Sequence, residues 1–74
     1  MDMRKTVGTN FMRLRKARGL TQEQVAEQSG YGQNYISWLE RGRRNPTVIT
    51  LFHLSEAVGA TPRDLVSPIH NDDL

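Results

Sequence analysis

The centre of the chain is residues 20–46, which read LTQEQVAEQSGYGQNYISWLERGRRNP. Thr21 followed by Gln24 has the spacing of a capping box, so a helix is expected over about 22–29. The glycine after it suits the left-handed conformation that ends helices. After the next glycine, the apolar spacing predicts a second short helix over about 33–41. These residues are therefore expected to form two short helices joined by a glycine-marked turn.

Helical spacing of apolar residues continues on both sides of this stretch, whereas the alternation typical of strands is absent. It predicts a first helix over about 5–18, a fourth over about 47–58 and a short fifth helix over about 61–66. The apolar positions of the first and fourth helices are Val7, Phe11, Leu14, Val48, Leu51, Leu54 and Val58. The expected fold is all-α: one compact five-helix domain over 1–66, then a flexible C-terminal tail over 67–74.

The composition of the chain argues against several classes of protein. The chain has 74 residues and no cysteine, which excludes disulfides and cysteine zinc sites. No apolar run approaches the roughly 20 residues that a membrane span needs, and the first residues lack the apolar segment of a signal peptide. We therefore expect a soluble cytoplasmic protein, without a cofactor or a metal.

Charge is distributed unevenly along the chain. The formal net charge is +2. Residues 1–44 hold nine basic and four acidic groups, a balance of +5, and residues 45–74 hold one basic and four acidic groups, a balance of −3. A basic half suits a polyanionic partner, because local charge matters more than net charge. An ordinary solvated surface is the alternative interpretation.

Three segments carry a resemblance to a known family: FMRLRKARGLTQEQVAEQSG, YISWLERGRRNP and LSEAVGATPRDLV. Together they span about residues 7–66 and resemble the helix-turn-helix domain of λ-type repressors and Cro-like regulators. In that family the second and third helices form the motif, and the third enters the major groove of DNA. The resemblance implies a small transcriptional regulator of double-stranded DNA, with the recognition helix over about 33–41. The YIS and RGRRN segments lean towards controllers of restriction–modification operons.

The resemblance also implies which residues contact DNA. Gln22 matches a position that holds a phosphate and braces the recognition helix. Gln33 and Asn34 match base-reading positions, and their amides suit the donor and acceptor edge of adenine. The remaining positions that match contacts are Ser37, Trp38, Arg43, Arg44 and Asn45. The arginines of the loop would contact the DNA backbone and supply salt-dependent affinity.

Two aromatic residues on the recognition helix leave alternatives open. Tyr35 can pack against the preceding helix, bond a phosphate or reach a base. Trp38 stands where the family more often has a polar or small residue, and an exposed indole is unfavourable unless something covers it. DNA and the loop over 42–46 are two possible covers for it.

Arg15 and Glu40 are expected to form a structural salt bridge. Arg15 lies on the inward face of the first helix, and Glu40 lies on the inward edge of the third. An unpaired buried charge is costly, so two opposite charges on converging faces should pair. The family resemblance pairs the same two positions.

A single domain of this size reads few base pairs, so two copies on a palindromic operator are expected. Ile49 and Phe52 flank the apolar stripe of the fourth helix. They either cover the small core or form, with Leu65 and Val66, a patch for self-association. No segment suggests a small-molecule effector, so control would follow from occupancy of the operator.

Two other classes of function were weighed against DNA binding. An enzyme is not expected, because His53 and His70 lack acidic or cysteine partners at ligand spacing and no phosphate-binding glycine loop is present. A protein-interaction module on the same fold is the alternative, since a fold alone does not fix function. The polar residues at 33–34 and the loop arginines favour DNA.

Overall fold

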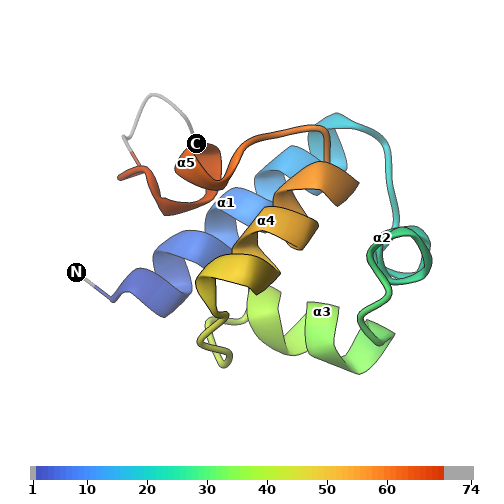
Figure 1. Ribbon diagram of the computed structural model, residues 1–74, viewed down its shortest axis with the longest axis horizontal. Helices are drawn as coiled ribbons and strands as arrows, with labels where there is room; N and C mark the ends of the chain where they lie inside the picture. Colours follow the sequence, from blue (N-terminus) through green and yellow to red (C-terminus); the bar gives the residue numbers. More distant parts are fainter. Residues whose placement is uncertain (1, 70–74) are drawn as a thin grey trace.

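The computed structural model describes residues 2–69, which form five α-helices (Figure 1). The helices are α1 (Met3–Ala17), α2 (Gln22–Ser29), α3 (Gln33–Glu40), α4 (Val48–Ala57) and α5 (Pro62–Val66). No strand occurs in this part of the chain, so the all-α prediction is confirmed. None of these helices is long and apolar enough to cross a membrane. Of the predicted flexible tail, residues 70–74 lie outside the described residues.

Side-chain caps explain where the first two helices begin. Asp2 accepts a hydrogen bond from the backbone N–H of Arg4 at 3.1 Å, so α1 begins at Met3, two residues earlier than predicted. Thr21 and Gln24 form the predicted capping box: each side-chain oxygen accepts from the other residue's backbone N–H, at 3.1 and 2.8 Å. The caps thus satisfy backbone donors that would otherwise lack partners in the first turn.

The five helices enclose one small apolar core. α1 packs against α3 and α5, α2 packs against α3 and α4, and α4 packs against α5. Each helix places at least one residue in the core, and the cap after α4 adds another. The buried apolar residues are Val7, Phe11, Val25, Ile36, Leu39, Leu54, Val58 and Leu65. Because every helix contributes, none can form its buried face without the others.

The short helix α5 is held in place by a buried polar residue of α1. The amide nitrogen of Asn10, which is 1% exposed, donates hydrogen bonds to the carbonyl oxygens of Leu65 and Ser67, both at 2.9 Å. At the other end of α5, the backbone N–H of Thr61 donates to Asp64 at 2.9 Å and holds the pKa of that carboxyl below its ordinary value. Tertiary hydrogen bonds therefore compensate for the low intrinsic stability of so short a helix.

Two expectations about apolar residues were wrong, and one of the two alternatives for Ile49 and Phe52 is excluded. Val48 was placed on the buried stripe of α4, but it lies in the first turn, beyond the end of the core, and is 77% exposed. Leu65 was a candidate for a surface patch, but it is fully buried between α1 and α4 because α5 packs on both. Ile49 and Phe52 do not cover the core, since 65% and 49% of their surfaces remain exposed. Val66 is exposed as expected.

α1 approaches the backbone of α3 closely at Gly8. A Cβ atom at this position would collide with the backbone carbonyl oxygen of Leu39 and lie 3.1 Å from the carbonyl carbon of Glu40. Both obstacles are backbone atoms of α3, so no side chain can move aside. Gly8 thus allows α1 to support the end of α3 directly.

Replacing Gly8 with alanine should therefore destabilise the fold by about 1–3 kcal/mol, the usual range for overpacking a tight contact. Urea denaturation followed by circular dichroism measures this loss. Gly32→Ala is the matched control, because that glycine has an ordinary φ and open space around it. Its free energy of unfolding should change by only about half a kcal/mol. Equal losses for the two variants would contradict the steric explanation.

Candidate nucleic-acid interface

The α2–turn–α3 unit presents α3 at one edge of the molecule (Figure 1). Gly30 ends α2 in the left-handed conformation, with φ of 81°, which residues with a Cβ rarely adopt. Gly32 then precedes α3 with an extended backbone and provides no side-chain cap. The turn between them is therefore short, and α2 packs directly against α3.

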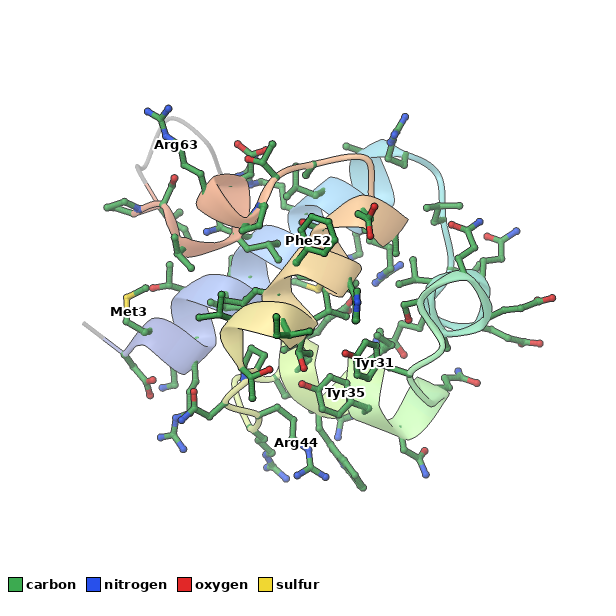
Figure 2. All side chains as sticks on the ribbon, viewed as in Figure 1. Met3, Tyr31, Tyr35, Arg44, Phe52 and Arg63 are labelled. Carbon is green, nitrogen blue, oxygen red and sulfur yellow. The ribbon has the colours of Figure 1, made fainter. Side chains whose placement is uncertain are left out.

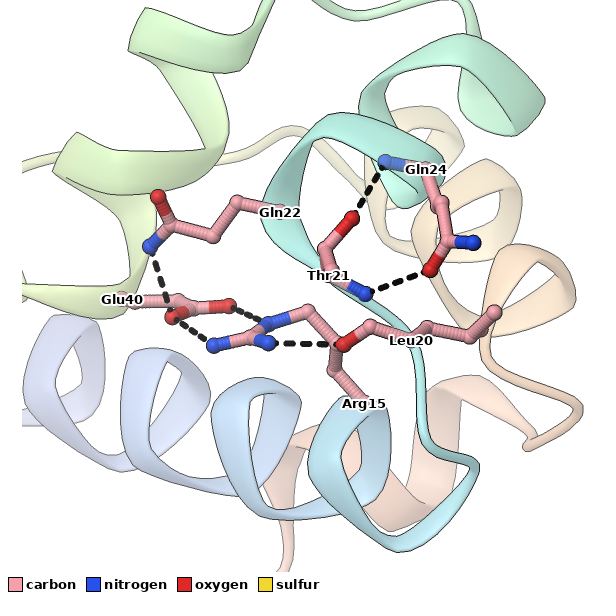
Figure 3. A network of polar contacts seen from close by, with 6 residues as sticks. All are labelled: Arg15, Leu20, Thr21, Gln22, Gln24 and Glu40. Carbon is pink, nitrogen blue, oxygen red and sulfur yellow. Dashed lines mark hydrogen bonds and ion pairs between the residues drawn. The ribbon is translucent and has the colours of Figure 1, made fainter.

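A buried ion pair fixes the C-terminal end of α3 (Figure 3). The guanidinium of Arg15 donates to both carboxylate oxygens of Glu40, at 2.6 and 2.9 Å. The side chains of Arg15 and Glu40 are only 10% and 4% exposed. The hydrogen bonds from Arg15 to Glu40 hold the pKa of the guanidinium above its ordinary value. α1 is thereby joined to the recognition helix by two charge-assisted bonds.

Two further hydrogen bonds extend this pair to α2. Gln22, the first residue of α2, donates from its amide nitrogen to Glu40 at 3.0 Å. Arg15 donates to the carbonyl oxygen of Leu20 at 2.8 Å, just before the cap of α2 (Figure 3). Glu40 therefore receives bonds from α1 and α2 at once, and the three helices share one polar junction. Gln22 braces α3 from this position, as the resemblance implied.

The first turn of α3 presents polar side chains to solvent. Gln33 and Asn34 are both exposed, whereas Ile36 and Leu39 on the opposite side of the helix are fully buried. Ser37 lies one turn after Gln33 and is half-buried. Amide groups at an exposed helix start have free donors and acceptors, which is the arrangement that major-groove readout requires.

Tyr35 packs against Tyr31 beside this polar turn. Their ring centroids are 5.2 Å apart in a stacked arrangement (Figure 2), and burial raises the pKa of Tyr35. The hydroxyl of Tyr31 donates to Thr50 at 3.2 Å and lies 3.2 Å from Nδ1 of His53, both on α4. The start of α3 is thus connected to α4 through Tyr31, and Tyr35 is half-buried rather than fully presented to solvent.

The loop after α3 returns towards the helix and places Arg44 over Trp38. The guanidinium carbon of Arg44 lies 4.6 Å from the centroid of the Trp38 ring and 5.7 Å from that of Tyr35. Trp38 keeps 38% of its surface exposed, so the loop covers the indole in part. The loop side chains Arg41, Arg43, Arg44 and Asn45 are exposed. Three exposed arginines therefore follow the C-terminal end of α3, and Arg44 among them lies beside the rings of Trp38 and Tyr35.

Comparison with known proteins identifies this arrangement. A helix-turn-helix family model matches residues 11–65. The chain belongs to the helix-turn-helix family. Among its relatives, the HTH-type transcriptional regulator y4dJ of Sinorhizobium fredii is 62% identical over 68 residues, which are 92% of this chain and 88% of that protein. The resemblance noted in the sequence is thereby confirmed.

Controllers of restriction–modification systems are also similar to this helix-turn-helix protein. The control protein C.SmaI of Serratia marcescens is 36% identical over 67 residues, covering 90% of this chain and 80% of that protein. The crystal structure of the controller protein C.AhdI from Aeromonas hydrophila superposes with a TM-score of 0.79 and 35% identity, over 84% of this chain and 94% of that one. The fold of this chain is thus shared with a solved controller protein.

In the structure, the predicted site residues Gln33, Asn34 and 43–45 are all exposed, and Arg15 pairs with Glu40. Contacts that the sequence did not indicate include the Tyr31 bonds to α4 and the stacking of Arg44. Three aromatic residues at 31, 35 and 38, followed by the arginine at 44, were the available signal, but which of them meet depends on the path of the loop.

Removing the carboxylate of Glu40 leaves Arg15 buried without its partner. Glu40→Ala should therefore lower the free energy of unfolding by about 3–5 kcal/mol, the range for breaking a buried pair. Thermal and urea denaturation measure the loss. Glu27→Ala on the exposed side of α2 is the control and should stay within about 0.5 kcal/mol of the unaltered protein. An unchanged melting temperature for Glu40→Ala would mean that the pair does not stabilise the fold.

Proposed function

We propose that this protein regulates transcription by binding a specific sequence of double-stranded DNA, with α3 in the major groove. The observation that carries the proposal is the exposed pair Gln33 and Asn34 on a helix whose opposite side is buried and whose end is fixed by Glu40. A rigid helix with free amides at its start suits readout of base edges. The adjoining exposed arginines suit the phosphates, and membership of the helix-turn-helix family agrees with both roles.

The roles of individual residues follow from this placement. Gln33 and Asn34 read bases, and Ser37 lies one turn further along the same helix. Arg43 and Asn45 face the backbone of the duplex, where contacts add affinity without sequence choice. Gln22 serves chiefly as a brace, because its amide nitrogen already donates to Glu40. Tyr35 serves chiefly in packing, because it stacks on Tyr31.

The proposed roles of Gln33 in base recognition and of Arg43 in phosphate contact can be tested by two substitutions. Gln33→Ala should relax the choice of base at one position, at about 1–3 kcal/mol for a lost bidentate contact. Arg43→Ala should weaken binding to every sequence and reduce the salt dependence by about one phosphate contact. Operator selection from random DNA, followed by fluorescence anisotropy on duplexes with single base changes, separates the two effects.

Gln28 is an exposed glutamine of α2 that lines a pocket with Arg18 and Ala57, and no residue of α3 lines that pocket. Gln28→Ala is therefore the control and should bind as the unaltered protein does. If the protein binds no DNA even at low salt, a protein-interaction module replaces the proposed regulator. Binding that is insensitive to salt would also contradict the role given to the arginines.

We further propose that two copies bind a palindromic operator through the exposed apolar surface of α4 and its neighbours. Apart from Trp38, the large apolar residues exposed within residues 2–69 are Met3, Val48, Ile49, Phe52 and Val66. None of these belongs to α3. Figure 2 shows Phe52 on α4 and Met3 at one side, with Arg44 at another edge. Pairing through this surface leaves the recognition helix free for DNA, and repression would then follow from occupancy of the operator.

Phe52→Ser tests the pairing surface. In a symmetric dimer each substitution removes two contacts, so the dissociation constant of the dimer should rise by on the order of tenfold or more. Sedimentation at several concentrations, with and without operator DNA, measures it, and Glu56→Ser on the same helix serves as the control. A pure monomer in the unaltered protein, on operator DNA as well as free, would exclude the dimer.

A further inference from the structure

The side chain of Arg44 lies over the ring of Trp38, near the C-terminal end of α3. The guanidinium carbon of Arg44 lies 4.6 Å from the indole centroid and 5.7 Å from the Tyr35 centroid. Both distances fall within the roughly 6 Å over which a cation is attracted to the face of an aromatic ring. Arg43, the neighbouring arginine, stacks on no ring in the described part of the chain. The two adjacent arginines therefore differ in how firmly their side chains are held.

The backbone of the loop places Arg44 at this position. Gly42 adopts the left-handed conformation, with φ of 75°, and turns the chain back after α3. The backbone N–H of Arg43 then donates to the carbonyl oxygen of Trp38 at 2.9 Å. A Cβ atom on Gly42 would lie 2.8 Å from Cγ of Lys5 on α1. The loop is thus packed against α1 at one side and bonded to α3 at the other, so Arg44 starts from a constrained backbone.

No carboxylate in residues 2–69 forms an ion pair with the guanidinium of Arg44. The rings of Trp38 and Tyr35 lie beside the guanidinium carbon, and the planar guanidinium carries its five N–H donors around its edge. An arginine held in this way loses less conformational entropy when it binds an anion than one that moves freely. A DNA phosphate has the charge and the acceptor geometry that these N–H groups suit.

We infer that Trp38 is a positioning residue that, together with Tyr35, holds the Arg44 guanidinium ready for a DNA phosphate beside the recognition helix. This inference rests on the proposed function, because it assumes that the surface binds DNA. It explains why an indole occupies an exposed position of α3 without a base-reading role. It also ranks the loop arginines: Arg44 is the ordered phosphate contact, whereas Arg43 must be ordered by binding.

The free protein gives the first test, because Trp38 is the one tryptophan of the chain. Arg44→Ala should shift the emission maximum of Trp38 to longer wavelength and increase its quenching by acrylamide, since the ring loses its cover. Arg43→Ala removes the same charge from the next position and should leave the emission unchanged. Equal spectra for Arg44→Ala and the unaltered protein would overturn the stacked arrangement.

A double-mutant cycle on DNA gives the second test. Dissociation constants are measured by anisotropy on the selected operator and on an unrelated duplex. Arg44→Ala should weaken both complexes by on the order of tenfold and lower the salt slope by about 0.9. Trp38→Ala should weaken both complexes as well, and the double variant should be little weaker than Arg44→Ala, because the indole acts through the arginine. Trp38→Ala combined with Arg43→Ala is the control pair and should be additive.

Conservative variants keep the test meaningful if Trp38→Ala fails to fold. Trp38→Phe retains an aromatic face and should keep most of the affinity, whereas Arg44→Lys keeps the charge without the planar group and should lose part of it. Additive losses for Trp38 and Arg44, or a loss confined to the operator, would overturn the inference because the indole or the arginine would then read bases. Failure of the unaltered protein to bind any duplex would instead overturn the proposed function itself.

Discussion

Arg15 and Glu40 face each other with almost no access to water, and either charge alone would be costly to bury. Their pairing is possible because Gly8 lets α1 approach the end of α3, and Gln22 completes the hydrogen bonds of the carboxylate. The same four residues therefore set the distance and the orientation of α3 relative to α1 and α2. This junction therefore also fixes the position of the exposed amides of Gln33 and Asn34, which lie about two helical turns away at the other end of α3.

Local rules predicted the helices well, because capping and apolar spacing are properties of neighbouring residues. Thr21 and Gln24 formed their capping box, and Phe11 lies in the core. The rules failed where burial depends on distant helices. Val48 and Leu54 both belong to the helical pattern of apolar residues in α4, but Val48 lies beyond the end of the core. Leu65 is covered because Asn10 holds α5 against α1. No local pattern contains that information.

In the candidate site, too, features set by neighbouring residues could be predicted, and features that depend on distant segments could not. Residue type and family position pointed to Gln33 and Asn34, whose exposure follows from the buried face behind them. The loop over 42–46 was one possible cover of Trp38 on the basis of the sequence. That Arg44 provides this cover could not be predicted, since it depends on the left-handed Gly42 and on the path of the loop across α1. Arginines in a charged run look alike in a sequence. Only the three-dimensional arrangement separates the one that rests on a ring from the one that does not.

The hydroxyl of Tyr31 fastens the residues before α3 to Thr50 and His53 of α4, the helix that also carries Ile49 and Phe52. Two copies paired through α4 would hold their recognition helices at one separation, because Tyr31 connects α4 to the residues that precede α3. One extra base pair between two half-sites moves the second half-site by about 3.4 Å and rotates it by roughly a tenth of a helical turn. Such a rigid connection would make the spacing of an operator as selective as its bases.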